Sequence, residues 1–429
     1  MFKRLVPATG TPEFDECIRI AQTGSLAEVQ TKANELGFKS DRTFLNAMRG
    51  YGYKREQPRH TTPVPELVVE DVSKKKLTAE VAHYKGLYKQ AVDQLALHQT
   101  VEDVINQAAS LVPPVVVKTV AATKHVLPRA KGSETDLLQV SDLHGGEVVR
   151  LDETLGINEY NMDIMNRRMG MMFRKALELV ELRRGTLYIP KLIVAESGDM
   201  LSGDIHQELS RTNVTNMMML AVRVAYIMSQ GLAYLSPHFE SIYVPCVVGN
   251  HPRLSKKPTY KEKYYNWDFL CYQWQAAFCK GLPNVTFEIP KAPYMLFNAE
   301  KTRIVMFHGD WIKSWSTIPY YGIERAILRL RETLQAHGDY FDAALMSHFH
   351  QRAEIPRATG PVIINGSVKG GDEYSLGSLQ TSNFPSQNLL YFHSKNGFLG
   401  GGPIYLAEAD SKPDLAFKDM LPDVWADLL

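Results

Sequence analysis

From about residue 137 onward, short apolar runs alternate with long helical patterns, and this alternation limits the possible folds more than any other feature. Continuous apolar strands between helices are typical of a layered α/β core whose strands are buried on both faces. We therefore expect strands at 137–140, 192–195, 242–248, 303–307, 343–346, 389–392 and 403–406, and helices at 161–184, 213–235, 267–279 and 324–336.

Five of these expected strands lead directly into residues of the types that bind metals. A single Asp-x-His or His-x-His is commonly a surface feature, but five such segments, each after an apolar strand, indicate one site. The carboxyl ends of the strands in an open α/β sheet are the edge where sites form. In chain order the residues are Asp142, His144, Asp199, Asn250, His251, His308, His348 and His350.

The ligand types predict two divalent cations. Nitrogen and oxygen ligands without a thiolate favour Mn, with Fe, Zn or Co as further candidates. Two such cations would lower the pKa of a shared water, which would attack as hydroxide, and would neutralise a transferring phosphoryl group. We expect Asp142, His144 and His350 to hold one cation, Asn250, His308 and His348 to hold the other, and Asp199 to bridge them.

The order Asp-x-His, Gly-Asp, Gly-Asn-His, His and His-x-His resembles the calcineurin-like metallophosphoesterase superfamily over about residues 136 to 406. The resemblance implies a β-sandwich of two mixed sheets flanked by helices, and the same ligand roles. It makes His251 the proton donor or a phosphate contact, although Pro252 stands where many relatives have an acid. Segments 158–161, 202–206 and 365–374 look like a bacteriophage branch described as DNA-repair-exonuclease-like, which implies a nuclease.

A basic and aromatic stretch at 253–267 directly follows the Gly-Asn-His segment. Cations neutralise phosphates and aromatic faces stack on bases, so the stretch predicts a nucleic-acid track, with a solvated loop as the alternative. The candidate substrate contacts are Arg253, Lys256, Lys257 and, in the loop after Asp199, His206.

Residues 1–60 read as short helices and carry three more basic than acidic residues. A helix at 26–36, a turn at 37–40 and a helix at 41–48 are similar to a helix-turn-helix DNA-binding unit. Arg42, Asn46 and Arg49 would then be available on the second helix. A plain packing module remains the alternative.

The rest of the chain divides by composition. Apolar spacing over 77–95, within a helical region at 66–110, indicates a short coiled coil that could pair two copies of the chain, or a helix that packs on its own protein. Proline and glycine then mark a linker at 111–135. We expect the catalytic domain at 136–410 and a docked or loose tail at 411–429.

Composition excludes several classes of protein. The net charge of +1 gives no whole-protein attraction to nucleic acid, so DNA binding would need a local patch. Four scattered cysteines do not form a disulfide framework, and no apolar run of about 20 residues is apparent. We expect a cytoplasmic protein without a membrane partner, in the host cytoplasm if it is viral. The predicted function is a metal-dependent DNA nuclease; the alternatives are a phosphatase or phosphodiesterase for small-molecule or protein esters and a non-catalytic DNA-binding or assembly protein.

Overall fold

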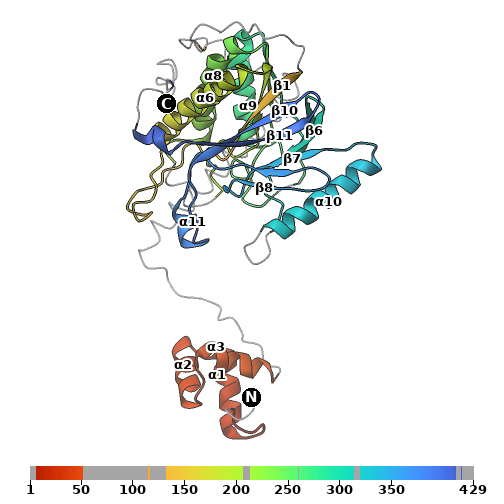
Figure 1. Cartoon of the computed structure of the whole chain (residues 1–429). Helices are drawn as coiled ribbons and strands as arrows, with labels where there is room; N and C mark the ends of the chain where they lie inside the picture. Colours follow the sequence, from red (N-terminus) through yellow and green to blue (C-terminus); the bar gives the residue numbers. More distant parts are fainter. Residues whose placement is uncertain are drawn as a thin grey trace, which may run out of the picture. The chain divides into compact units, whose positions relative to one another are not determined.

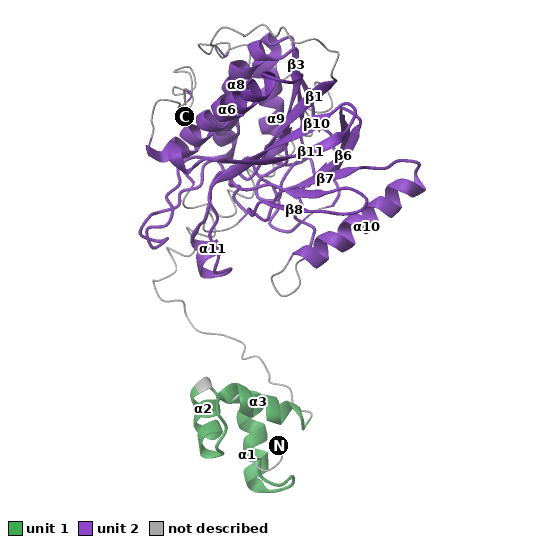
Figure 2. Ribbon diagram, viewed as in Figure 1, with its two compact units in different colours: residues 1–93 green, residues 94–429 purple. Residues whose placement is uncertain are grey.

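A computed structural model describes residues 6–51, 115, 132–205, 213–258, 260–313, 319–411 and 417 (Figure 1). The chain divides into two compact units, residues 1–93 and 94–429 (Figure 2). The predicted helix at 66–110 lies outside the described residues, and so does most of the predicted linker. Each unit is considered by itself.

Three short helices form the first unit: α1 Pro12–Thr23, α2 Leu26–Glu35 and α3 Asp41–Arg49. Each begins at a Thr or Ser whose hydroxyl accepts a backbone N–H of the first turn, which fixes where the helix starts. Gly37, with φ of 74°, makes the turn between α2 and α3, because a left-handed backbone favours glycine. The helices and turn predicted for 26–48 are confirmed.

The second unit contains two mixed sheets. The first has six strands in the order β11-β10-β1-β2-β3-β4, and the second has five in the order β5-β6-β7-β9-β8. In the first sheet β1 to β4 pair in parallel, whereas β10 pairs antiparallel with β1 on one side and with β11 on the other. The strands are β1 Ser133–Val140, β2 Tyr188–Glu196, β3 Ser241–Pro245, β4 Val285–Glu288, β5 Tyr294–Ala299, β6 Thr302–Phe307, β7 Ala343–Met346, β8 Ala353–Ile355, β9 Val362–Ile364, β10 Ser386–His393 and β11 Gly397–Tyr405.

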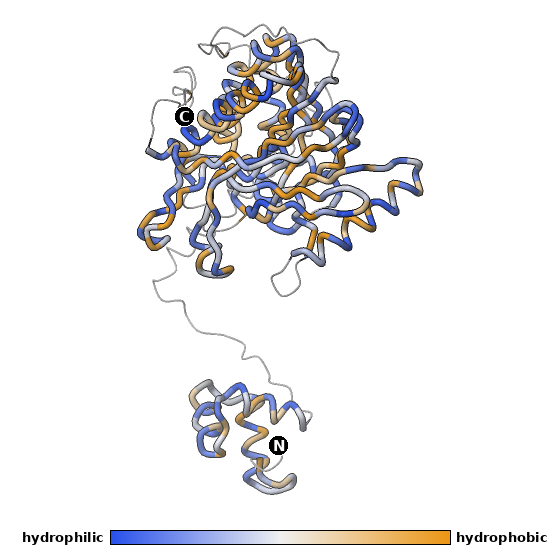
Figure 3. Tube along the Cα trace, viewed as in Figure 1, coloured by the Kyte–Doolittle hydropathy of each residue, from blue (hydrophilic) through white to orange (hydrophobic). Residues whose placement is uncertain are grey.

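Helices cover the outer face of each sheet, and the two inner faces pack against each other. Alternate residues of β1 show the division, because Leu138 packs in the cluster with α6, α8 and α9, whereas Leu137 packs in the cluster shared with the second sheet. The amphipathic helix α10 packs on the other face of the second sheet (Figure 3). The predicted helix-flanked sandwich is confirmed. Its helices are α6 Met162–Arg184, α8 Met217–Leu235, α9 Trp267–Phe278, α10 Tyr320–Ala336 and α11 Glu373–Gly377.

Among the described residues, the segment Met217–His238, which contains α8, is long and apolar enough to cross a membrane by length and composition. Sequence reading had found no such run, so the finding corrects that expectation. The helix is a core element here, because 78% of its most apolar window is buried. Core helices of globular proteins pass the same test.

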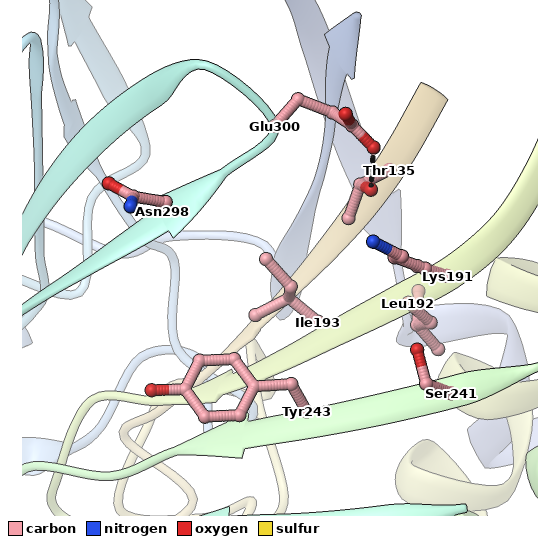
Figure 4. A pocket seen from close by; sticks show the side chains of 8 residues that line it. All are labelled: Thr135, Lys191, Leu192, Ile193, Ser241, Tyr243, Asn298 and Glu300. Carbon is pink, nitrogen blue, oxygen red and sulfur yellow. Dashed lines mark hydrogen bonds between the residues drawn. The ribbon is translucent and has the colours of Figure 1, made fainter. Parts of the chain in front are cut away.

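Four strands, β4, β5, β8 and β9, were absent from the sequence-based prediction, and β1 begins at Ser133, three residues before the expected domain start. In the predicted tail, Phe417 pairs through its backbone with Asn166 of α6. A cavity of about 290 Å³ lies near the amino ends of β1 and β3, lined by Lys191, Tyr243 and Glu300 among others (Figure 4). It is therefore at the end of these strands away from the predicted ligands.

Candidate metal centre

The loops after β1, β2, β3, β6 and β7 bring the predicted ligands together. Three clusters of Asp and His residues have ligand atoms within 4.8 Å of one another. Because His144 and Asp199 each belong to two of the clusters, the three clusters are contiguous. The clusters are Asp142, His144 and His350; Asp199, His308 and His348; and His144, Asp199 and His251.

Five of the predicted ligands have a left-handed backbone, which is rare for residues with a side chain. The conformation costs roughly 1–2 kcal/mol per residue, and such strain collects at functional sites. Hydrogen bonds between neighbouring loops hold the strained turns; for example, Asp142 N donates to Gly198 O at 3.0 Å. The φ angles are 52° at Asp142, 49° at His144, 54° at Asp199, 75° at His348 and 58° at His350.

Each of the two aspartates has one oxygen held by the protein and one that faces a histidine. Asp142 Oδ2 accepts from Ser141 Oγ at 2.7 Å, and Asp199 Oδ1 accepts from His251 N at 2.9 Å. The other oxygens, Asp142 Oδ1 and Asp199 Oδ2, are buried and accept no well-formed hydrogen bond among the described residues. Asp199 Oδ2 lies 3.1 Å from His308 Nε2. These unsatisfied anionic oxygens are suited to a cation.

Three histidines are oriented through Nδ1, which leaves Nε2 directed at the centre. His308 Nδ1 donates to Ser197 O at 2.8 Å, and His251 Nδ1 donates to Ser202 O at 3.1 Å. His144 Nδ1 lies 3.5 Å from a carboxylate oxygen of Glu147. Such backing contacts are typical of metal-binding histidines, because they fix the tautomer and the ring orientation.

Opposite these contacts, lone-pair atoms face one another. His144 Nε2 lies 3.1 Å from His350 Nε2, and His308 Nε2 lies 3.1 Å from Asn250 Oδ1. Since neutral imidazole nitrogens oriented in this way, carboxylates and an amide oxygen all present lone pairs, a cation is the partner that satisfies them together. The donor set therefore fits divalent metal binding.

Burial keeps most of these histidines neutral. It lowers the pKa of His251 and the pKa of His348 to about 4, and it lowers the pKa of His144 well below its ordinary value. Burial would also lower the pKa of His308, but Asp199 beside it outweighs burial and raises that pKa to about 10. Asp199 therefore stabilises positive charge beside His308, while the other rings, being neutral, can bind a cation through their lone pairs.

Sequence reading missed Glu147 and Lys369. Both are buried, and Lys369 Nζ donates to Glu147 at 2.9 Å and also to Asp372. The ammonium group compensates the negative charge that Glu147 places behind His144. Glu147 follows His144 by three residues, which was the only sequence signal for it.

Two further buried acids lie near the loop after β2. Asp268 of α9 accepts backbone N–H groups from this loop and from the loop after β3. Glu196, the last residue of β2, accepts from Gln275 at 2.8 Å, and burial raises its pKa to about 8. Glu196 is therefore a protonated core residue at neutral pH, in a place where an apolar residue would otherwise be expected.

The predicted substrate contacts divide into three kinds. His206 lies outside the described residues. Arg253 donates to the backbone carbonyls of Asn250, Ser255 and Lys256, so it shapes the ligand loop and is half-buried. Lys256 and its neighbour Lys257 are exposed.

Two of the segments that look like the bacteriophage branch contact each other. Asn158 Nδ2 donates to the carbonyls of Lys369 and Gly371, at 3.0 and 2.6 Å. Asn161 begins α6 by accepting from Ile164 N. These residues support the loop that carries Lys369, which gives them a structural role behind the metal centre.

No family model and no curated relative matches the chain. Similar solved structures include vacuolar protein sorting 29 of Cryptosporidium parvum, at 13% identity and a TM-score of 0.28, covering 64% of this chain and 99% of that one. An archaeal phosphodiesterase is similar at 11% identity and a TM-score of 0.27, covering 63% and 99%. A predicted phosphoesterase of Streptococcus pneumoniae is similar at 11% identity and a TM-score of 0.24, covering 64% and 98%.

Proposed function

We propose that the second unit is a metal-dependent phosphoesterase with two divalent cations, Mn being our first choice. The observation that carries the proposal is the convergence of ligand atoms from five strand ends, with buried carboxylate oxygens of Asp142 and Asp199 left without a hydrogen bond, on a backbone that is left-handed at five expected ligands. Strain and unpaired charge of this kind are maintained where a ligand compensates them. When bound, the two cations make water nucleophilic near neutral pH and neutralise the charge of a phosphoryl group.

The side chains of this chain have distinct parts in that reaction. Asp199, one oxygen of which accepts from His251 N, would help to hold both cations. The hydrogen bond to Ser197 O holds His308 in the tautomer that presents Nε2 to the centre, and Glu147, 3.5 Å from His144 Nδ1, favours the same tautomer there. These fixed dipoles and charges need little reorganisation during the reaction.

His251 is the proposed substrate-contacting residue. Its ring packs edge-on against His144 at a centroid distance of 4.5 Å, and Nδ1 is held by Ser202 O. Because Nδ1 is the donor to this carbonyl, Nε2 is the ring nitrogen that would contact the phosphoryl group or its leaving oxygen. In many relatives an acid after this histidine could orient its ring, but here Pro252 follows His251. The carbonyl of Ser202 orients the ring instead.

Hydrolysis of a panel of substrates tests the proposal. The full chain is incubated with Mn²⁺ and with single-stranded, duplex and nicked DNA, RNA, and aryl phosphate monoesters and diesters. We expect hydrolysis of a diester that stops in chelator. Cleavage of aryl esters but not of nucleic acid would favour a small-molecule phosphoesterase. No hydrolysis of any substrate by folded, metal-loaded protein would refute catalysis and leave a binding protein.

DNA is the substrate that we favour, and unit 1 supports this choice. Arg42, Asn46 and Arg49 are exposed at spacings of four and three on α3, so they share one helix face. By contrast, Arg19 of α1 lies 3.8 Å from Glu28, which offsets its charge. Within residues 6–51, this face of α3 thus combines two arginines that form no ion pair with a hydrogen-bonding amide.

Exposed side chains after the Gly-Asn-His segment give a second line of support. Lys256 and Lys257 are exposed, and Tyr260 is 87% exposed. Trp311, which follows His308, is 39% exposed. A cationic and aromatic surface of this kind binds nucleic acid by neutralising phosphates and stacking on bases.

The α3 hypothesis is tested by DNA binding in chelator, where cleavage cannot occur. Arg42→Ala and Arg49→Ala should each weaken binding to duplex DNA, and each lost phosphate contact should flatten the salt dependence by about 0.9 in the log–log slope. Arg19→Ala is the matched control and should change neither quantity. Equal effects of the three substitutions would contradict a role of the α3 face.

A further inference from the structure

Asp268 lies behind the metal centre and touches two of its loops. It is the second residue of α9, and none of its surface is exposed. Its Oδ2 accepts from Asp199 N at 2.8 Å and from Gly249 N at 2.9 Å, and its Oδ1 accepts from Met200 N at 3.1 Å. One carboxylate thus connects the loop after β2 with the loop after β3.

The two loops are packed so closely that a small displacement of one would move the other. A Cβ atom on Gly249 would lie 2.0 Å from Asp199 Oδ1. The start of α9 holds the loop after β3 by a second contact, because Asn266 Nδ2 donates to the carbonyl of Gly249 at 2.9 Å. The amino end of α9 therefore binds both the N–H and the carbonyl of Gly249, the residue before Asn250.

We propose that Asp268 is a positioning residue for the metal centre, and the proposal rests on the proposed two-metal function. It sets the distance between Asp199, the expected bridge, and Asn250, a ligand of the second cation. A carboxylate suits this place because both of its oxygens accept hydrogen bonds, and charge-assisted bonds to backbone N–H groups are strong. Asp268 is not one of the expected ligands, since both of its oxygens already accept backbone N–H groups.

Asp268→Asn is the test substitution, since it retains the shape of the side chain. An amide has one oxygen and one NH₂ group, so in either orientation an NH₂ group would face at least one backbone N–H donor. The chain provides a matched control in Asp163, which is likewise the second residue of a helix that begins after an Asn cap. Asp163 is exposed, so Asp163→Asn reports only the generic effect of a charge at a helix start.

The experiment measures Co²⁺ binding to the full chain through the visible absorption of the bound ion. We expect the parent protein to bind two ions and Asp163→Asn to bind them equally well. Asp268→Asn should bind about 10- to 100-fold more weakly, as for other residues that support metal ligands. The loss should be larger for the ion held by Asn250, His308 and His348 than for the other ion. Unequal loss separates positioning from a general loss of stability, which urea unfolding in chelator measures independently.

Equal Co²⁺ affinities in folded Asp268→Asn and in the parent protein would overturn the proposal and leave the two-metal function intact. If the parent protein binds no Co²⁺, the proposed function and this inference both fail. If Asp268→Asn does not fold, Asp268→Glu takes its place. That change retains both carboxylate oxygens but displaces them by one methylene from the backbone N–H groups that they bind. It should also weaken Co²⁺ binding, and unchanged binding would again overturn the proposal.

Discussion

His350 offers a direct test of whether the metal centre stores backbone strain. Its φ is 58°, and its side chain reaches His144 Nε2 at 3.1 Å without being fully buried. Replacing it by Ala removes the ligand and retains the strain, whereas replacing it by Gly removes both. The difference between the two variants therefore isolates the cost of the backbone conformation.

The expected difference is about 1 kcal/mol in favour of Gly. A left-handed residue with a Cβ costs roughly 1–2 kcal/mol, from which the greater freedom of Gly in the unfolded chain subtracts about 0.4–1 kcal/mol. For a urea dependence of about 3 kcal/mol per M, His350→Gly should unfold at about 0.3 M higher urea than His350→Ala. Both variants should lose Co²⁺ affinity to the same extent, because both lack the imidazole.

Urea unfolding in chelator, followed by tryptophan fluorescence, measures this difference. All five tryptophans lie between residues 267 and 425, so the signal reports the second unit alone. Leu155, which has a φ of 55° and is 88% exposed, provides a control, because Leu155→Gly should again be more stable to urea than Leu155→Ala. Glu354 of strand β8 is exposed and extended, so there Gly should be less stable than Ala by roughly 0.5–1 kcal/mol.

Stored backbone strain at His350 is refuted if His350→Ala is at least as stable as His350→Gly while the Leu155 pair shows the expected order. That result would mean that the loop relaxes when the imidazole is absent. The strain would then be a consequence of the side chain and not a property of the fold.

Three further predictions follow from the site and its surroundings. Asp199→Asn should abolish hydrolysis because the expected bridging carboxylate is lost, and chelator should abolish it because the cations are removed. Full turnover of an aryl diester in either case would contradict the two-metal centre. His251→Asn should slow DNA cleavage by about 10²–10⁴-fold but aryl diester cleavage far less, since a phenoxide leaves without a proton; equal losses would assign His251 to phosphate binding. Burial raises the pKa of Glu196 to about 8, so the folded protein retains a proton that the unfolded chain releases above about pH 4.5, and stability is lost as the pH rises from there to about 8. Glu196→Gln should remove this dependence, by up to about 2–3 kcal/mol between pH 5 and pH 7 in urea unfolding, and parallel pH profiles of variant and parent would contradict it.

The sequence by itself determined the central strands and the residues expected to be ligands. The run 343–346 is predicted with the same bounds that β7 has, because a strand buried on both faces must be apolar throughout. The polar residues after such strands were predicted to meet, since parallel strands place their carboxyl ends at one edge. In the structure, ligand atoms of His348 after β7 and of Asp199 after β2 lie within 4.8 Å of each other, and His350 belongs to a similar cluster with Asp142 and His144.

The short outer strands were not predictable from sequence in the same way. In β4 the burial alternates between half-buried and exposed residues, so the segment has no continuous apolar run. Such a strand is specified by the neighbour with which it pairs, and β4 pairs with β3 from about 40 residues earlier in the chain. Its pattern alone is compatible with a loop.

Only the tertiary structure decided how the ligands are held. The left-handed turns at the ligands, the carbonyl of Ser197 behind His308 and the carboxylate of Asp268 behind Asp199 join segments far apart in the chain. A sequence pattern records which side chains a segment carries, whereas the orientation of a ring and the position of a loop depend on contacts with other segments. The chemistry available to the site was therefore written in local sequence, and its geometry came from long-range packing.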